Sequence, residues 1–218
     1  MTVTDKEELV IPEVSIYNPD RGEDIILKSI HIDTDYVCDA EGRVEYFNVE
    51  EADNYLSKQG KSVASLPLLV NIYIVLNTLA REDKTADRIL EQLNTAWDRT
   101  GTTISPSGKI VHTDSIIGEV IYENLQIPLE GNVVNELYIS HADFFRALLG
   151  LRDLNRLTDV TEKNGLIPFY WYPRGERHVM FGSGDFYYMH QHIPGLLMVF
   201  CDEEPHPRRI LRGVWADK

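Results

Sequence analysis

The sequence predicts an α+β fold: a mostly antiparallel sheet around a central antiparallel helical hairpin. Strand-like runs fill much of the first 49 residues, helical periodicity dominates from 50 to 99, and short strand-like runs return after Gly165. Strands and helices that are segregated along the chain favour α+β over alternating βαβ units. The sheet is expected to combine an N-terminal hairpin with the C-terminal strands.

The N-terminal hairpin is predicted over residues 24–49. The first dozen residues are polar and acidic and are expected to form a loose arm. Residues 24–37 are rich in Ile and indicate a strand, and Val44, Tyr46 and Val49 continue as the returning strand. DAEGR at 39–43 supplies the turn, with Gly42 where a left-handed backbone is wanted.

Three helices are predicted in the middle of the chain. The first covers 50–58, and Gly60 follows its end. Ser65 is the N-cap of the second, with Pro67 in its first turn, and apolar residues surround this helix on nearly all sides, which is typical of a buried helix. Residues 84–99 form its amphipathic partner, and the short connection favours an antiparallel pair.

The remaining chain is expected to hold two strand-like runs around the SPSGK turn within 102–113, and a helix that starts at Ser140 and extends through Leu157. Strands are predicted at 167–172, 177–181, 185–191, 196–201 and 208–215, with the GSG at 182–184 as a hairpin turn. We expect one domain over 1–218, with 161–166 as the alternative boundary.

Charge and cysteine content limit the partners and the location. The net charge is −14, which repels a nucleic-acid backbone. The densest basic cluster, Arg208, Arg209 and Arg212, is expected on the solvated face of a last strand. The two cysteines, without a CxxC, indicate reduced thiols. With no signal-peptide pattern at the N-terminus, we expect a cytoplasmic protein. The uncharged run 62–80 contains Asn and Pro and is interpreted as a buried helix rather than a membrane span.

His190-Gln-His192 is the sharpest candidate metal pattern. Residues two apart in a strand project from the same face, so these imidazoles can share a divalent transition metal. With Gly184 the stretch is similar to the opening of the cupin metal motif, G-x5-H-x-H. The glutamate of that motif is missing, because Leu196 and Leu197 stand in its place, so the chain is not assigned to the cupins.

A second candidate set lies on the first predicted hairpin. His31, Asp33 and Asp35 alternate and are expected to line one polar strand face, and one histidine with two carboxylates is a credible ligand set. The sequence leaves open whether this face meets His190 and His192 in space. His178 is a further candidate ligand. The alternative for this strand is an ordinary solvated face without a ligand.

The aromatic run near the C-terminus predicts a binding surface. Tyr170, Trp171 and Tyr187 are candidates for contact with a partner, and Arg174 beside them can stack or bind an anion. The first hypothesis is therefore a binding or assembly protein, with a protein partner or a second copy of itself. The alternative is a metal-dependent enzyme, a hydrolase or oxygenase that uses the histidine-bearing strand. The sequence contains no complete catalytic motif, so it leaves open whether the protein is an enzyme.

Overall fold

The computed structural model describes residues 8–47, 49–129, 132–171, 177–188, 191–201 and 211–217. It confirms an α+β fold. The helices are α1 (Val49–Ser57), α2 (Leu66–Leu79), α3 (Lys84–Leu93), α4 (Val134–Tyr138), α5 (Ala142–Leu149) and α6 (Asn155–Lys163). The strands are β1 (Glu8–Asn18), β2 (Glu23–Asp33), β3 (Trp97–Ser105), β4 (Lys109–Asp114), β5 (Gly118–Tyr122), β6 (Asn132–Val133), β7 (Ile167–Trp171), β8 (Arg177–Tyr188), β9 (Gln191–Cys201) and β10 (Val214–Ala216).

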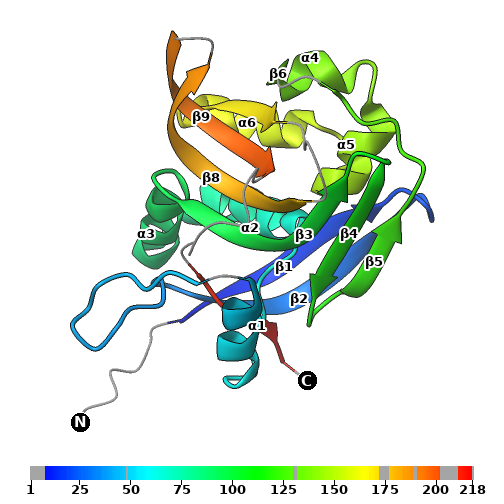
Figure 1. Ribbon diagram of the computed structural model, residues 1–218. Coiled ribbons are helices and arrows are strands. Elements are labelled where there is room, and N and C mark those ends of the chain that lie inside the picture. The colour runs from blue at the N-terminus through cyan, green and yellow to red at the C-terminus, as the bar shows by residue number, and fades with distance from the viewer. Residues whose placement is uncertain are drawn as a thin grey trace.

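The strands form two sheets (Figure 1). One has the order β1-β2-β10, and the other has the order β5-β4-β3-β8-β9-β7-β6. β7 and β9 run parallel, whereas the other described pairs are antiparallel. β10 joins β2 after some 180 residues of intervening chain, so the C-terminal end closes the N-terminal sheet.

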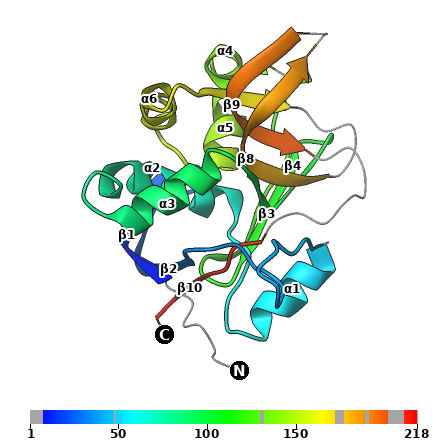
Figure 2. The ribbon, with the colours of Figure 1, turned by 90° about the vertical axis from the view of Figure 1, so that its left-hand side faces the viewer.

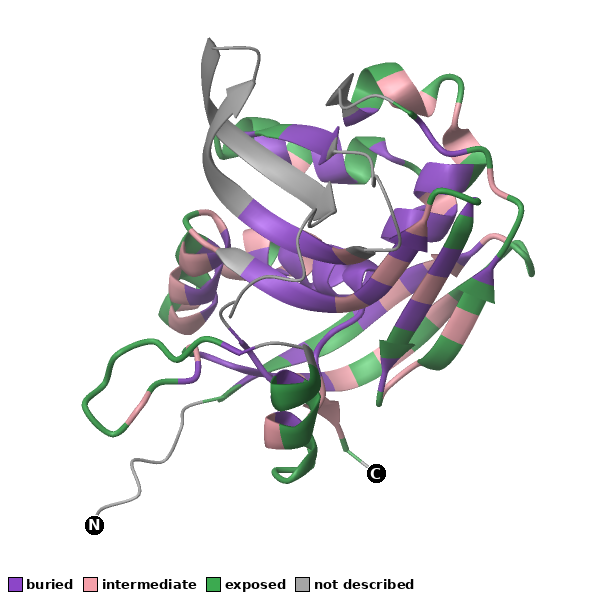
Figure 3. Ribbon diagram, viewed as in Figure 1, coloured by how far each residue is buried: buried purple, intermediate pink, exposed green. Residues whose placement is uncertain are grey.

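α2 is the centre of the main core. It packs against β1 of the small sheet, β3 and β8 of the large sheet, and the helices α3, α5 and α6. Its residues from Leu66 to Tyr73 are all buried, which confirms the predicted buried helix (Figure 3). Ser65 precedes it with an extended backbone, and Pro67 lies in its first turn as expected. α3 packs on α2 as the second half of the helical hairpin.

α1 belongs to a second, smaller core. Figure 2 shows it on the far side of β3 from α2 and α3. The small core consists of Val37, Phe47, Ala52, Leu56, Val63 and Leu211. It therefore fastens the segment after β2, the helix α1 and the start of the C-terminal segment to one another.

The N-terminal hairpin differs from the prediction. The expected loose arm is wrong from Glu8 onward, because Leu9, Ile11, Val14 and Ile16 of β1 point into the core and β1 pairs with β2. The hairpin turn lies at 19–22, where Gly22 has a φ of 66°. The predicted returning strand at 44–49 is not an extended strand in the described residues but is reduced to isolated bridge positions, among them the bridge between Cys38 and Val44, and Val37 and Phe47 pack around α1.

Three further boundaries differ. α3 ends at Leu93, since residues 97–105 pair as β3 with β4 and β8. The helix predicted from Ser140 to Leu157 breaks at Gly150, whose φ of 60° ends α5. The GSG at 182–184 is not a turn but part of β8, and the β8–β9 register shifts just after it.

The strands predicted around SPSGK are confirmed as β3 and β4, and 167–172 corresponds to β7. In the described part of the chain, no helix is long and apolar enough to cross a bilayer. The single domain over 1–218 stays a prediction.

Candidate functional site

Tyr170, predicted to contact a partner, is buried. Its exposed fraction is 0%, and its ring meets the rings of Phe144 and Phe145 edge-on at centroid distances of 5.4 and 5.5 Å. Phe169 is buried as well. β7 has α5 and α6 packed near it, so this strand contributes to the core and Tyr170 is not on a binding surface.

The other predicted C-terminal contacts fall outside what is described. Trp171, Tyr187 and His192 lie in β7, β8 and β9 by their backbone, and their side chains are outside the described set. Arg174 and His190 lie outside the described residues altogether. The aromatic surface and the His190–His192 metal site therefore stay predictions.

His31 and Asp33 lie two residues apart on β2, and each is already engaged by other residues of the chain. The His31 ring stacks on Trp215 at 5.1 Å, and its nitrogens lie 3.2 Å from Glu8 and 3.1 Å from Asp217. Asp33, 2% exposed, forms a 2.5 Å ion pair with Lys61. These contacts fasten β1 and the chain after α1 to β2 and β10.

Asp35 does not share that face. β2 ends at Asp33, so the alternation stops, and the exposed Asp35 lies 3.5 Å from Arg88 instead. Among the described side chains, no three His, Cys, Asp or Glu residues are grouped to hold a metal ion. The metal site that combines His31, Asp33 and His178 with His190 and His192 therefore stays a prediction.

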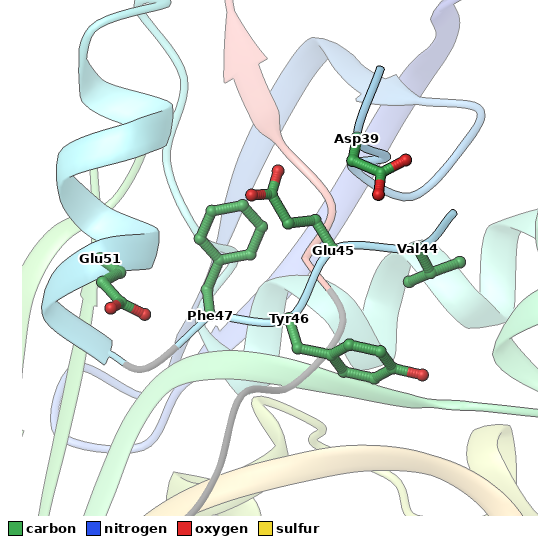
Figure 4. A pocket seen from close by; sticks show the side chains of 6 residues that line it. All are labelled: Asp39, Val44, Glu45, Tyr46, Phe47 and Glu51. Atoms are coloured by element: carbon green, nitrogen blue, oxygen red, sulfur yellow. The ribbon is translucent and has the colours of Figure 1, made fainter. Parts of the chain in front are cut away.

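The first cavity is the acidic pocket, lined by Asp39, Val44, Glu45, Tyr46, Phe47 and Glu51 (Figure 4). Its volume is about 490 Å³, within the range of roughly 300–1,000 Å³ usual for ligand pockets. Tyr46 is 53% exposed and Val44 is 37% exposed, so apolar surface is open to solvent beside the three carboxylates. Figure 4 shows Glu45 and Phe47 on one side of an extended segment and Tyr46 on the other.

The walls of the acidic pocket are held by the chain's own hydrogen bonds. Asp39 accepts from the backbone N–H of Glu41 and Arg43 at 3.0 and 2.9 Å, and from the Arg43 guanidinium at 2.8 Å. These hydrogen bonds lower the pKa of the Asp39 carboxyl, and the bond from the Arg43 backbone N–H has the largest effect. Phe47 packs on Tyr55 of α1 at a centroid distance of 5.1 Å. The pocket is therefore largely preformed.

The second cavity, the β3 pocket, has a volume of about 180 Å³. Its titratable lining residues are Asp53 of α1, Arg99 of β3 and His178 of β8, and its other lining residues are Val63, Thr100, Gly101, Thr103, Val111 and Thr113. Burial raises the pKa of the Asp53 carboxyl, and the positive charges of His178 and Arg99 act against that rise. His178 is the one predicted site residue that lines a described cavity.

An irregularity in β3 shapes this pocket. The register between β3 and β8 shifts between Arg99 and Thr103, so that Arg99, Thr100 and Gly101 all reach one cavity, which regular alternation would prevent. A side chain at Gly101 would overlap the carbonyl oxygen of Thr113. The glycine therefore allows β3 to run close against the end of β4.

A third polar cluster surrounds Arg212, which is 6% exposed and not on a solvated strand face as expected. Its guanidinium donates to the Asp33 carbonyl at 2.6 Å and to Gln92 Oε1 at 2.5 Å, and lies 4.6 Å from the centre of the Tyr36 ring. The Arg212 charge also acts on Asp98, which is fully buried. Neither Asp98 oxygen accepts a hydrogen bond from any described residue.

The sequence did not single out Asp53, Arg99 or Asp98. The predicted helix over 84–99 takes in the first part of WDRTGTT (97–103), yet a glycine within a β-branched run is itself a signal of a bulge or a close backbone approach. Asp53 carried no such signal, because its role depends on α1 packing over β3.

The chain matches no protein-family model, no curated protein and no solved structure.

Proposed function

We propose that this chain is a binding protein that holds a positively charged segment of a protein partner in the acidic pocket. The observation that carries the proposal is the pocket itself, which combines three carboxylates with the exposed ring of Tyr46 in one open cavity. Lys and Arg side chains have an apolar stem and a charged end, and they match a surface of this mixed kind.

The overall charge of the chain favours a partner of positive charge. The chain has a net charge of −14, so a basic partner is attracted over distances comparable with the Debye length, about 8 Å at physiological salt. The hydrogen bonds of Asp39 order one wall before a partner arrives, and preformed walls reduce the entropy lost on binding.

The proposal keeps the class of function expected from the sequence, a binding protein with a protein partner, and moves the contact from the C-terminal aromatic run to 39–51. The alternative, a metal-dependent enzyme, depends on His190 and His192, which are not among the described side chains.

The test measures binding of a fluorescent decalysine peptide to the full chain by anisotropy at low salt, with a Gly-Ser peptide of equal length as the uncharged probe. Glu45→Gln with Glu51→Gln should weaken decalysine binding roughly tenfold, since each exposed charge pair contributes up to ~1 kcal/mol. Tyr46→Ser should weaken it further by removing the cation–π contact.

The matched control is Glu119→Gln with Glu123→Gln, which removes the same charge from exposed positions at and after β5. Its affinity should stay within about twofold of the wild type. Equal losses in the two double variants, or no decalysine binding at all, would show that the pocket is not the site.

A further inference from the structure

We propose that the β3 pocket binds a small molecule that carries an oxyanion, a carboxylate or phosphate group, together with a hydroxyl or amino group. This site is separate from the acidic pocket and does not depend on the function proposed above.

The oxyanion end is assigned to Arg99 and His178. Arg99 is 9% exposed and lines the cavity from a mostly buried position. Its Nη2 lies 3.5 Å from the carbonyl oxygen of Phe47, a contact that orients the side chain. A guanidinium presents a planar pair of donors that matches the geometry of a carboxylate or phosphate, and His178 adds a ring nitrogen from the neighbouring strand.

The hydroxyl or amino end is assigned to Asp53 and the threonines. Asp53 reaches the pocket from α1, across the cavity floor made by β3, β4 and β8. Thr103 of β3 is paired with both Val111 and His178, so these three residues share one sheet face. Thr113 lies two residues beyond Val111 and points the same way. Carboxylate and hydroxyl oxygens accept hydrogen bonds from ligand O–H or N–H groups.

The volume limits the ligand's size. About 180 Å³ corresponds to the space of roughly six water molecules at ~30 Å³ each, and it lies below the ~300 Å³ at which drug-sized ligand pockets begin. A metabolite of three or four carbon atoms fits this volume.

The backbone supports a built site. A bulge in a strand commonly lies next to a functional site and re-aims side chains, and this one brings consecutive residues of β3 to the same cavity. Gly101 is needed for the close approach to Thr113, and its N–H donates to the carbonyl of Ala64 at 2.8 Å. The floor of the pocket is therefore fixed by backbone contacts.

The experiment titrates the ¹⁵N-labelled full chain with inorganic phosphate and with glycerate, and uses glycerol as the probe without an oxyanion. We expect saturable shifts of the amide signals of Gly101 and His178 with at least one of the two oxyanions and none with glycerol. Saturable shifts with phosphate alone would indicate that the natural ligand carries a phosphate group. Saturable shifts with glycerate alone would indicate a carboxylate group. No saturation with either probe by 50 mM, about the weakest binding that a specific small-ligand site would show, overturns the proposal.

Variants locate the site. Arg99→Lys keeps the positive charge but loses the pair of planar donors, so the affinity for the oxyanion should fall at least about tenfold. Arg156→Lys, at an exposed position in α6, is its matched control. If Arg99→Lys fails to fold, Thr113→Val tests the site instead, because Thr113 is exposed and its replacement should not disturb the fold. Thr95→Val, at another exposed position, is the matched control. If the wild type, Arg99→Lys and Thr113→Val bind the oxyanion with equal affinity, the proposed site is wrong. The variants of the acidic pocket should bind the oxyanion as tightly as the wild type does.

Discussion

Two buried titratable residues respond to pH in opposite directions. Burial raises the pKa of the Asp98 carboxyl to about 6, against a smaller opposing effect of Arg212. Burial lowers the pKa of His112 to about 4. The neutral His112 donates from Nε2 to the Ala147 carbonyl at 3.0 Å and accepts from the Thr102 hydroxyl at 2.8 Å. Thr102 in turn accepts from the Leu66 N–H at 2.9 Å, so His112 links β3, β4, α5 and the start of α2.

These shifts predict opposing effects on stability. The folded state binds the Asp98 proton more tightly than the unfolded state, whose pKa is near 3.8, so this residue adds stability as the pH falls from about 6 to about 4. His112 has its ordinary pKa of 6.5 when unfolded, so its contribution is lost as the pH falls from about 6.5 to about 4. Each effect spans roughly two pKa units, or about 3 kcal/mol, and the two largely offset in the wild type.

Asp98→Asn should therefore make the protein more sensitive to acid. Between pH 7 and pH 4 the variant should lose about 2 to 3 kcal/mol more unfolding free energy than the wild type. Urea unfolding across this range measures the difference, with Asp159→Asn, at an exposed position in α6, as the control. Parallel stability curves for wild type and Asp98→Asn would contradict the assigned role of Asp98.

At the scale of the elements, α5 and α6 end in the same way but in different surroundings. Gly150 follows α5 with a φ of 60°, and Gly165 follows the α6 end with a φ of 68°. A Cβ at Gly150 would lie 2.7 Å from the Cβ of Pro67 and 2.8 Å from a methyl group of Ile16. A Cβ at Gly165 would meet nothing within 4 Å. Gly150 therefore combines a left-handed backbone with tight packing against α2 and β1.

Gly150→Ala should destabilise the protein by about 2 to 5 kcal/mol, and Gly165→Ala by only about 1 to 2 kcal/mol. Both variants force an L residue into the left-handed region, which costs roughly 1–2 kcal/mol, and only the first adds overpacking at roughly 1–3 kcal/mol. Thermal and urea unfolding of the two variants measure the difference. Equal losses of unfolding free energy in Gly150→Ala and Gly165→Ala would show that tight packing of Gly150 against α2 and β1 does not contribute to stability.

The helices were the most predictable elements, and α3 marks the limit of that success. Asp83 caps α3 by accepting from the N–H of Thr85 and Ala86 at 2.7 and 3.1 Å, and such caps are local in sequence. The helical spacing continues to Trp97, but the chain leaves the helix because β3 completes ladders with β4 and β8. Strand pairing with residues far along the chain thus outweighed the local periodicity at this end.

At the scale of the whole molecule, Arg212 connects three parts that are distant in sequence. It touches Asp33 at the end of β2, Gln92 in α3 and Tyr36 after β2, and its charge faces Asp98 in β3 of the large sheet. Burial, with a further contribution from Asp98, raises the pKa of Tyr36, so the phenol stays neutral. The C-terminal segment is therefore held by buried electrostatic contacts as well as by the β10–β2 ladder.

Arg212→Met should cost about 3–5 kcal/mol at pH 8, because it leaves the ionised Asp98 buried without its positive partner. Adding Asp98→Asn to Arg212→Met should recover part of that loss, and a double-mutant cycle by urea unfolding measures the coupling. Arg88→Met, which removes the surface pair with Asp35, should cost less than about 1 kcal/mol. Strictly additive effects of the Asp98 and Arg212 changes would contradict the proposed interaction.

The amino-acid sequence alone determined the α+β class, the buried α2 and the starts of α1, α2 and α3, because periodicity and caps act between residues a few positions apart. Only the tertiary structure decided that residues 8–18 are a strand, that Tyr170 is core and that Arg212 is buried. It also brought Asp53, Arg99 and His178 to one cavity from α1, β3 and β8. Pairings of this kind depend on packing between distant segments, which no local pattern encodes.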